Sequence, residues 1–119
     1  MTTSDLQAAK PEAAYDDFAK LDIRVGRIIA VEPFPRARNP SYKVQVDLGP
    51  LGTRWSSAQI TNYDAAELVG TAVVCVCNFA PRNIAGFRSE VLILGARDER
   101  GRVILLSPHS GVPLGATIY

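Results

Sequence analysis

The clearest alternation of apolar and polar positions lies in residues 42–48. Four apolar residues, from Tyr42 to Leu48, alternate there with three polar ones. A period of two is typical of a strand that buries one face. Residues 49–52 (GPLG) then turn the chain, so residues 53–60 are predicted to return as the next strand.

An earlier strand is predicted over residues 22–32. The alternation places Ile23 and Ile29 on one face and Ile28 on the other. Gly26 inside this strand predicts a bulge or a sharp bend, which a small barrel requires.

Three further segments are apolar on both faces, namely residues 71–77, 91–96 and 103–106. The charged residues 97–102 (RDERGR) between the last two are typical of a hairpin turn. Strands that are apolar on both faces need cover on both sides, and a small barrel covers only one side with its own core. The pattern therefore predicts a homodimer, the commonest symmetric assembly.

Proline and glycine interrupt these segments. Three prolines in residues 33–40 (PFPRARNP) exclude a helix or a strand interior and predict an exposed loop. Residues 78–87 are predicted to form a second loop. Residues 108–119 are predicted to be irregular until a final short strand.

Two short helices are predicted. Asp64 and Glu67 have the spacing of a capping box, and Gly70 can end that helix. Asp16 and Asp17 precede an apolar i, i+3 pair and suit the N-terminus of a helical turn.

The predicted fold class is all-β. It is a five-stranded OB-fold barrel with a short helix between strands 3 and 4 and a short N-terminal helical turn. The barrel domain would span residues 15–119. Residues 1–14 lack apolar periodicity and are expected to form a flexible N-terminal arm. An SH3-like barrel is the alternative, but that fold usually lacks the central helix.

A chain of 119 residues, 47% apolar and 21% charged, suits one domain with its own core. Such a core forms without disulfides or a metal ion. No apolar run approaches the roughly 20 residues of a membrane-spanning helix, and the N-terminus lacks the features of a secretory signal. These observations predict a cytoplasmic protein without membrane insertion.

The net charge of +1 hides an uneven distribution. Residues 1–22 contain two lysines and five acidic residues, whereas residues 24–88 contain eight basic and four acidic residues. The basic middle suits a surface that binds a polyanion, although the same split also occurs on ordinary solvated surfaces.

Enzyme and metal chemistry find no support in the sequence. It has no glycine-rich phosphate loop, and its only histidine, His109, is distant in sequence from Ser56 and Ser57. Cys75 and Cys77 are too few for a structural zinc site, and they would point to one face of a strand as reduced, buried thiols. No catalytic residue, metal or cofactor is therefore expected.

Basic residues gather instead around the loops and strands where OB-folds bind oligonucleotides. Nearby aromatic residues are Phe34, Tyr42 and Trp55. Such rings stack on bases, but the strand positions of Tyr42 and Trp55 also suit the core. The basic residues that are candidates for binding RNA are Arg36, Arg38, Lys43, Arg54, Arg82 and Arg88.

Several motifs resemble the tRNA-binding domain of methionyl-tRNA synthetases and of free-standing tRNA-binding proteins. They are residues 18–26 (FAKLDIRVG), 46–49 (VDLG) and 78–90 (NFAPRNIAGFRSE). The CsaA branch of export-related chaperones is resembled more narrowly by residues 40–43 (PSYK), 56–61 (SSAQIT) and 89–95 (SEVLILG). General members carry Gly-Met where this chain has Val91-Leu92, which favours the CsaA branch.

The resemblance implies an OB-fold homodimer that binds tRNA or tRNA-like RNA. It also implies a chaperone for unfolded or export-bound polypeptides, with the export machinery as a further partner. The implied RNA contacts come from Lys43, Ser89 and Leu92, although the Ser89 hydroxyl also suits a turn. The peptide-binding residues stay unknown. The alternative is a dedicated tRNA-binding protein without a chaperone role.

Overall fold

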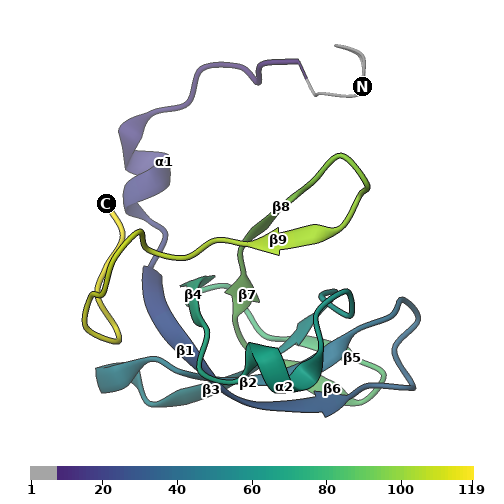
Figure 1. Ribbon diagram of the computed structural model, residues 1–119. Coiled ribbons are helices and arrows are strands. Elements are labelled where there is room, and N and C mark those ends of the chain that lie inside the picture. The colour runs from purple at the N-terminus through teal and green to yellow at the C-terminus, as the bar shows by residue number, and fades with distance from the viewer. Residues whose placement is uncertain (1–7) are drawn as a thin grey trace.

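The computed structural model describes residues 8–119, and its framework is a five-stranded antiparallel sheet (Figure 1). The strand order in the sheet is β3-β2-β1-β4-β7. The strands span Ile23–Pro33 (β1), Tyr42–Asp47 (β2), Thr53–Ala58 (β3), Ala72–Val76 (β4) and Leu92–Ile93 (β7). The alternation predicted for β2 is confirmed, because Val44 and Val46 are fully buried.

The two edges of this sheet meet and nearly close it into a barrel. The Glu90 amide donates to the Trp55 carbonyl over 2.8 Å. The buried Ser56 hydroxyl donates to the Val91 carbonyl, also over 2.8 Å. These bonds satisfy backbone groups that an open edge would leave unpaired. The predicted all-β, OB-like barrel is thus confirmed.

Short helices accompany the strands. They are α1 at Tyr15–Ala19, the 3-10 turn η2 at Gly49–Leu51 and α2 at Ala65–Leu68. The Asp64 amide donates to the Glu67 carboxylate over 2.7 Å at the start of α2, and Gly70 follows its end with a φ of 93°. Both predicted helices are confirmed, and α2 lies between β3 and β4, as an OB-fold requires.

Two small hairpins complete the chain. One joins β5 (Arg82–Ile84) to β6 (Phe87–Ser89), and the other joins β8 (Gly95–Arg97) to β9 (Val103–Leu105). The prediction of a loop over residues 78–87 therefore holds for residues 78–81 but is wrong for residues 82–87, which form the first of these hairpins. Ala85 and Gly86 both have positive φ, 49° and 83°, and two such residues make the tight turn whose twist matches a hairpin.

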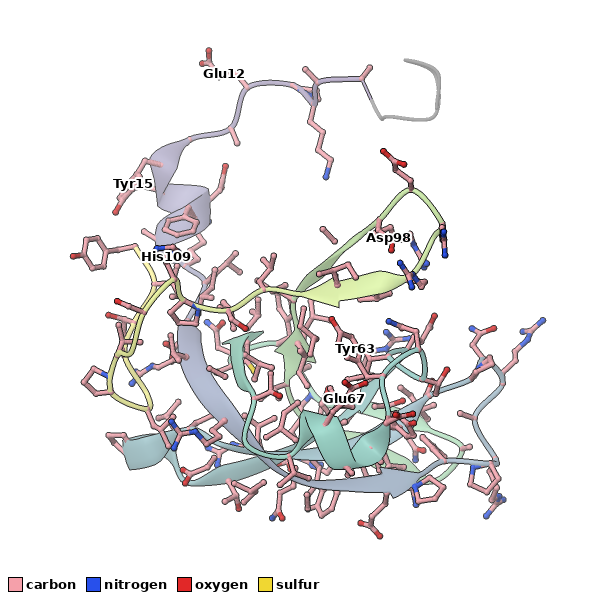
Figure 2. All side chains as sticks on the ribbon, viewed as in Figure 1. Glu12, Tyr15, Tyr63, Glu67, Asp98 and His109 are labelled. Carbon is pink, nitrogen blue, oxygen red and sulfur yellow. The ribbon has the colours of Figure 1, made fainter. Side chains whose placement is uncertain are left out.

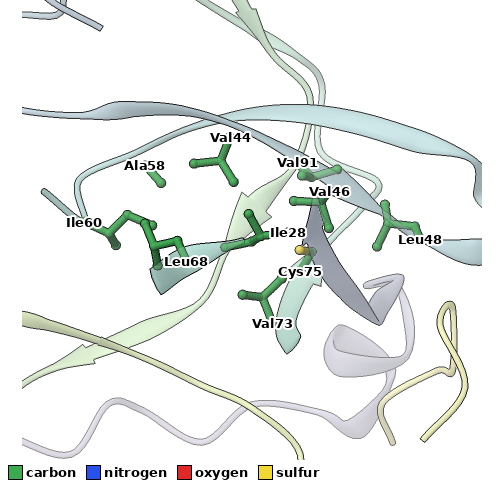
Figure 3. Close-up of a cluster of buried hydrophobic side chains, with 10 residues drawn as sticks. All are labelled: Ile28, Val44, Val46, Leu48, Ala58, Ile60, Leu68, Val73, Cys75 and Val91. Atoms are coloured by element: carbon green, nitrogen blue, oxygen red, sulfur yellow. The ribbon is translucent and has the colours of Figure 1, made fainter. Parts of the chain in front are cut away.

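The barrel interior holds one cluster of buried side chains, drawn from β1 to β4, the segments that join them and Val91 just before β7 (Figure 3). Burying one aliphatic side chain of this size stabilises a fold by about 1.5–3 kcal/mol, so this cluster is the main support of the barrel. Its members are Ile28, Val44, Val46, Leu48, Ala58, Ile60, Leu68, Val73, Cys75 and Val91.

A bulge in β1 changes the alternation predicted for that strand. The register with β2 shifts between Ile28 and Ala30, so the bulge lies at Ile29 and not at Gly26. Because the bulge inserts one extra residue, Val31, which simple alternation would place on the face of the 41% exposed Ile29, packs instead against the core that holds Ile28.

Both faces of β4 are covered by the chain itself. Cys75 packs inside the barrel, whereas Val74 and Val76 form an outer cluster with Ile23. Leu21, Leu94 and Ile118 pack against that outer cluster. The sequence pattern had assigned this cover to a partner subunit, so β4 gives no support for a dimer.

The C-terminal segment supplies part of this cover by pairing with β1. The Gly115 amide donates to the Val25 carbonyl, and the Ile118 amide donates to the Ile23 carbonyl, each over 2.8 Å. The predicted final strand is thus present as a short stretch of pairing at Thr117.

The remaining predictions concern the N-terminal arm and membrane insertion. The flexible arm predicted over residues 1–14 falls partly outside the described residues; residues 8–14 contain no helix or strand, and the arm stays a prediction. Within residues 8–119, no helix has the length and apolar character needed to cross a membrane.

Candidate nucleic-acid interface

The outer face of β2 and β3 carries the first part of the candidate site. Because Val44 and Val46 point into the barrel, Lys43 and Gln45 point outward. Gln45 lies opposite Trp55 in the register of the two strands. Trp55 therefore lies on the outer face and not in the core.

Lys43 lies over two aromatic rings on this face. Its Nζ is 5.0 Å from the ring centroid of Phe34 and 5.1 Å from that of Phe87. The Phe87 ring packs edge-on against Phe34, at 5.3 Å between centroids, and against Trp55, at 6.1 Å. We call these four residues the aromatic–lysine cluster. The cation–π attraction holds the ammonium group at a defined position.

A hollow of about 300 Å³ opens beside this cluster. Its walls combine the two cationic side chains of Arg36 and Lys43 with two phenylalanine rings. The lining residues are Phe34, Pro35, Arg36, Lys43, Ala85, Gly86 and Phe87. We call it the lysine hollow, and its walls offer one surface for phosphate and one for a ring.

A larger hollow, of about 550 Å³, lies against the end of β3. Three arginines line it: Arg38 from the loop after β1, Arg82 from β5 and Arg97 from β8. Leu92 of β7 also lines it. We call it the arginine hollow. The loop after β1 and the β5–β6 hairpin contribute residues to both hollows.

The structure brings five of the eight predicted RNA-binding residues to these hollows. Arg36 and Lys43 line the lysine hollow, and Arg38, Arg82 and Leu92 line the arginine hollow. Sequence reasoning grouped Arg36 with Arg38, but the loop that carries them separates the two hollows.

The other three predicted residues lie outside the hollows. The Arg54 guanidinium donates to the Leu51 carbonyl over 2.6 Å, so it supports the turn between β2 and β3. Arg88 is exposed on β6. The Ser89 hydroxyl accepts a hydrogen bond from the Ser57 amide over 3.0 Å and so helps to join β6 to β3.

Two contributors escaped the sequence analysis. Arg97 was assigned to a hairpin turn, and Phe87 was not placed beside Lys43. Neither proximity has a local signal in the sequence, because each depends on a hairpin that folds back toward β3. Tyr42 packs against the core, and its hydroxyl donates to the Tyr63 carbonyl over 2.8 Å.

The two cysteines are free thiols: Cys75 is buried and Cys77 is half-buried. Burial raises the pKa of Cys75 to about 12, and burial also raises the pKa of the half-buried Cys77. Both shifts favour the protonated thiol, so neither cysteine has the lowered pKa of a reactive thiolate. In the part of the chain that the structure describes, no group of three or more His, Cys, Asp or Glu side chains is arranged to hold a metal ion.

The comparison with known families agrees with this geometry. Residues 23–117 match the family described as "Putative tRNA binding domain". The chain belongs to this family. The match includes both hollows, the barrel and most of the C-terminal segment.

Two solved structures resemble the chain along nearly all of its length. The CsaA chaperone protein from Picrophilus torridus is 46% identical, with 91% of this chain and 100% of that one covered at a TM-score of 0.86. The chaperone CsaA from Bacillus anthracis str. Ames is 44% identical, with 92% and 100% covered at a TM-score of 0.86. The resemblance to CsaA-type tRNA-binding-domain proteins is confirmed.

Methionine–tRNA ligases share only this domain with the chain. The ligase of Thermococcus kodakarensis is 41% identical over 105 residues, which are 88% of this chain but 14% of the ligase. The similarity is thus limited to a small part of the ligases and does not extend over the rest of their length.

Proposed function

We propose that this protein is a non-catalytic, homodimeric binding protein that binds tRNA or tRNA-like RNA and chaperones unfolded or export-bound polypeptides. The aromatic–lysine cluster is the observation that carries the RNA part. The proposal implies a cytoplasmic location, because tRNA resides there.

The cluster offers both contacts that single-stranded or looped RNA needs. Lys43 and Arg36 line one hollow and supply cations for phosphate oxygens. The half-buried rings of Trp55 and Phe87 supply faces on which bases stack. Phe34, only 5% exposed, supports Phe87 from below rather than meeting RNA.

A salt titration of tRNA binding tests this face. Each phosphate contact contributes roughly 0.7–0.9 to the slope of log affinity against log salt. We therefore expect the variant Arg36→Ala, Arg38→Ala, Lys43→Ala to flatten the slope by about 2 units. The matched control is Lys10→Ala, Lys20→Ala, Arg100→Ala, which removes the same charge outside both hollows. Equal slopes for the two variants would place the RNA face elsewhere.

The chaperone part rests on the similarity to CsaA chaperones and on exposed apolar side chains. Phe79, Leu92 and Ile104 are 49%, 49% and 42% exposed. Such side chains suit apolar segments of an unfolded chain, whose binding depends little on salt. The assay is suppression of the aggregation of a denatured protein, with and without added salt. If suppression is absent, a dedicated tRNA-binding role replaces the chaperone role.

Support for the homodimer comes from exposed apolar side chains near the two ends of the chain, and not from β4. Helix α1 contains no buried residue, and Tyr15 and Phe18 are 74% and 37% exposed. Figure 2 shows Tyr15 directed away from the barrel. Near the other end, Val112 and Tyr119 are also exposed. A second copy of this terminal surface, related by twofold symmetry, would cover these side chains.

A further inference from the structure

Positive charge in the arginine hollow is not balanced by its walls. Arg38, Arg82 and Arg97 line it, and its described lining contains no Asp or Glu. Over residues 8–119, none of the three arginines forms an ion pair. The volume of about 550 Å³ falls in the range of small-ligand sites. The hollow therefore suits an anionic ligand of nucleotide size.

The rest of the lining indicates a ligand with apolar faces and polar edges. Aliphatic side chains form one part of the wall, and the amide side chains of Asn39 and Gln59 form another. A nucleobase has this character, because its ring faces are apolar and its edges carry donors and acceptors. The aliphatic lining residues are Ile60, Ile84, Leu92, Ile93, Val103 and Leu105.

We propose that the arginine hollow binds one unpaired nucleotide of an RNA, and this inference rests on the proposed function. The base lies on the aliphatic wall, and the adjoining phosphates pair with the arginines. Guanidinium groups suit this task because they bind phosphate in a bidentate manner and stack on bases. A base-paired nucleotide does not fit, because its pairing edge is occupied and it lies within a stack.

Two features favour RNA over polypeptide in this hollow. An RNA strand carries a phosphate at every nucleotide, so it can present an anion to each of the three arginines around the hollow. A polypeptide is anionic only where its sequence contains acidic residues. The same loop, which carries Arg36 and Arg38, and the same hairpin, which carries Arg82 and Phe87, contribute to both hollows. The two hollows are therefore neighbours, and in this proposal one strand of RNA occupies both.

Arg97 provides the sharpest test, because it lies on a separate hairpin from the lysine hollow. The ligands are a fully paired RNA duplex with blunt ends and the same duplex with a single-stranded 3′ extension, because the loop of an RNA hairpin would itself supply unpaired nucleotides. We expect wild type to bind the extended RNA more tightly. Arg97→Ala should lose about tenfold in affinity for the extended RNA, the usual effect of one charge-assisted contact, and leave the blunt RNA unchanged. The control Arg100→Ala removes the same charge from the same hairpin outside the hollow and should match wild type on both RNAs.

A second variant separates occupation of the hollow from the integrity of the hairpin, since the Arg97 guanidinium also donates to the Gly101 carbonyl over 2.8 Å. Leu92→Trp fills the hollow without changing charge, and Leu92 is exposed enough to accept a larger ring. It should weaken binding of the extended RNA while its salt slope stays at the wild-type value. Arg97→Ala should lower that slope by about 0.7.

The outcomes distinguish this inference from the proposed function. If wild type binds neither RNA, the proposed function fails. If wild type binds both with a steep salt dependence, but Arg97→Ala and Leu92→Trp bind the extended RNA normally, only the nucleotide site fails. An equal loss on blunt and extended RNA for Arg97→Ala also overturns the site, because it reflects charge alone. If Arg97→Ala abolishes binding of an acidic peptide but leaves the affinity for both RNAs unchanged, the hollow is assigned to polypeptide instead.

Discussion

Gly26 sets the distance between β1 and β2 by lacking a side chain. A Cβ atom added there would overlap a methyl group of Val46 and lie 2.9 Å from one of Leu48. The sequence indicated that a glycine in this strand had a structural reason. It could not indicate the reason, because the neighbours come from the next strand and depend on the register.

We expect Gly26→Ala to destabilise the protein by about 1–3 kcal/mol, the usual cost of forcing extra volume into a packed core. The measurement is the free energy of unfolding from urea titration. Gly111→Ala is the control, because a Cβ at Gly111 meets nothing within 4 Å, and its effect should stay within about 0.5 kcal/mol. Equal stability of wild type and Gly26→Ala would show that β1 and β2 can separate at no cost.

Cys75 and Cys77 show that the sequence predicted the role of both thiols but not their unequal burial. The pKa of Cys75 rises to about 12 through burial, above the ordinary value near 8.5. The folded protein therefore holds the thiol proton more tightly than the unfolded chain does. This contribution to stability is complete below about pH 8.5 and is lost as pH rises toward 12. At pH 8 we expect iodoacetamide to leave Cys75 unmodified in the native protein and to modify it in urea. The measurement is fragment-ion mass spectrometry of the tryptic peptide 55–82, which contains both cysteines. Rapid native modification of Cys75 would contradict this burial.

At the scale of elements, the seam between β3 and residues 89–91 closes the barrel with side-chain bonds as well as backbone bonds. The Ser56 hydroxyl, 1% exposed, bonds to the Val91 carbonyl, and the Trp55 amide donates to the Glu90 carboxylate over 3.0 Å. Removing the hydroxyl leaves the buried Val91 carbonyl without that partner. We expect Ser56→Ala to cost about 1–3 kcal/mol in unfolding free energy, measured by urea titration. The control Ser110→Ala, at an exposed position, should leave the unfolding free energy almost unchanged. An unchanged unfolding free energy for Ser56→Ala would contradict the prediction and show that water replaces the lost hydrogen bond.

The long strands could be predicted because each spans enough residues to show its alternation. Residues 42–48 and 22–32 were placed to within about two residues of β2 and β1. The β5–β6 hairpin was missed because its strands have three residues each, too few for a period to appear. The bulge at Ile29 was misplaced for a related reason: it depends on pairing with β2, which local pattern does not encode.

At the scale of the whole molecule, the candidate site joins segments that are distant in sequence. Basic composition and the OB-like topology singled out Lys43, Arg38 and Arg82, which the structure places at the two hollows. They could not sort these residues between two hollows, since that division depends on how the loop after β1 meets the β5–β6 hairpin. Arg97 escaped entirely, because a charged hairpin turn has the same local pattern whether its arginine faces solvent or a hollow.

The assembly of the molecule gives the last prediction. If two copies bury the terminal surface around Phe18 and Tyr119, dissociation accompanies unfolding, and mass action makes thermal stability depend on concentration. A hundredfold increase in protein concentration then adds about 2.7 kcal/mol per dimer and raises the unfolding midpoint by about 5–10 °C. Phe18→Asp should remove this dependence and give the 12.9 kDa mass of one chain by light scattering, where wild type gives twice that mass. Leu106→Asp, at another exposed apolar position, is the control that should remain dimeric. A midpoint of wild type that is independent of concentration, with a monomeric mass, would contradict the dimer. Loss of the dimer in Leu106→Asp alone would move the interface to the segment after β9.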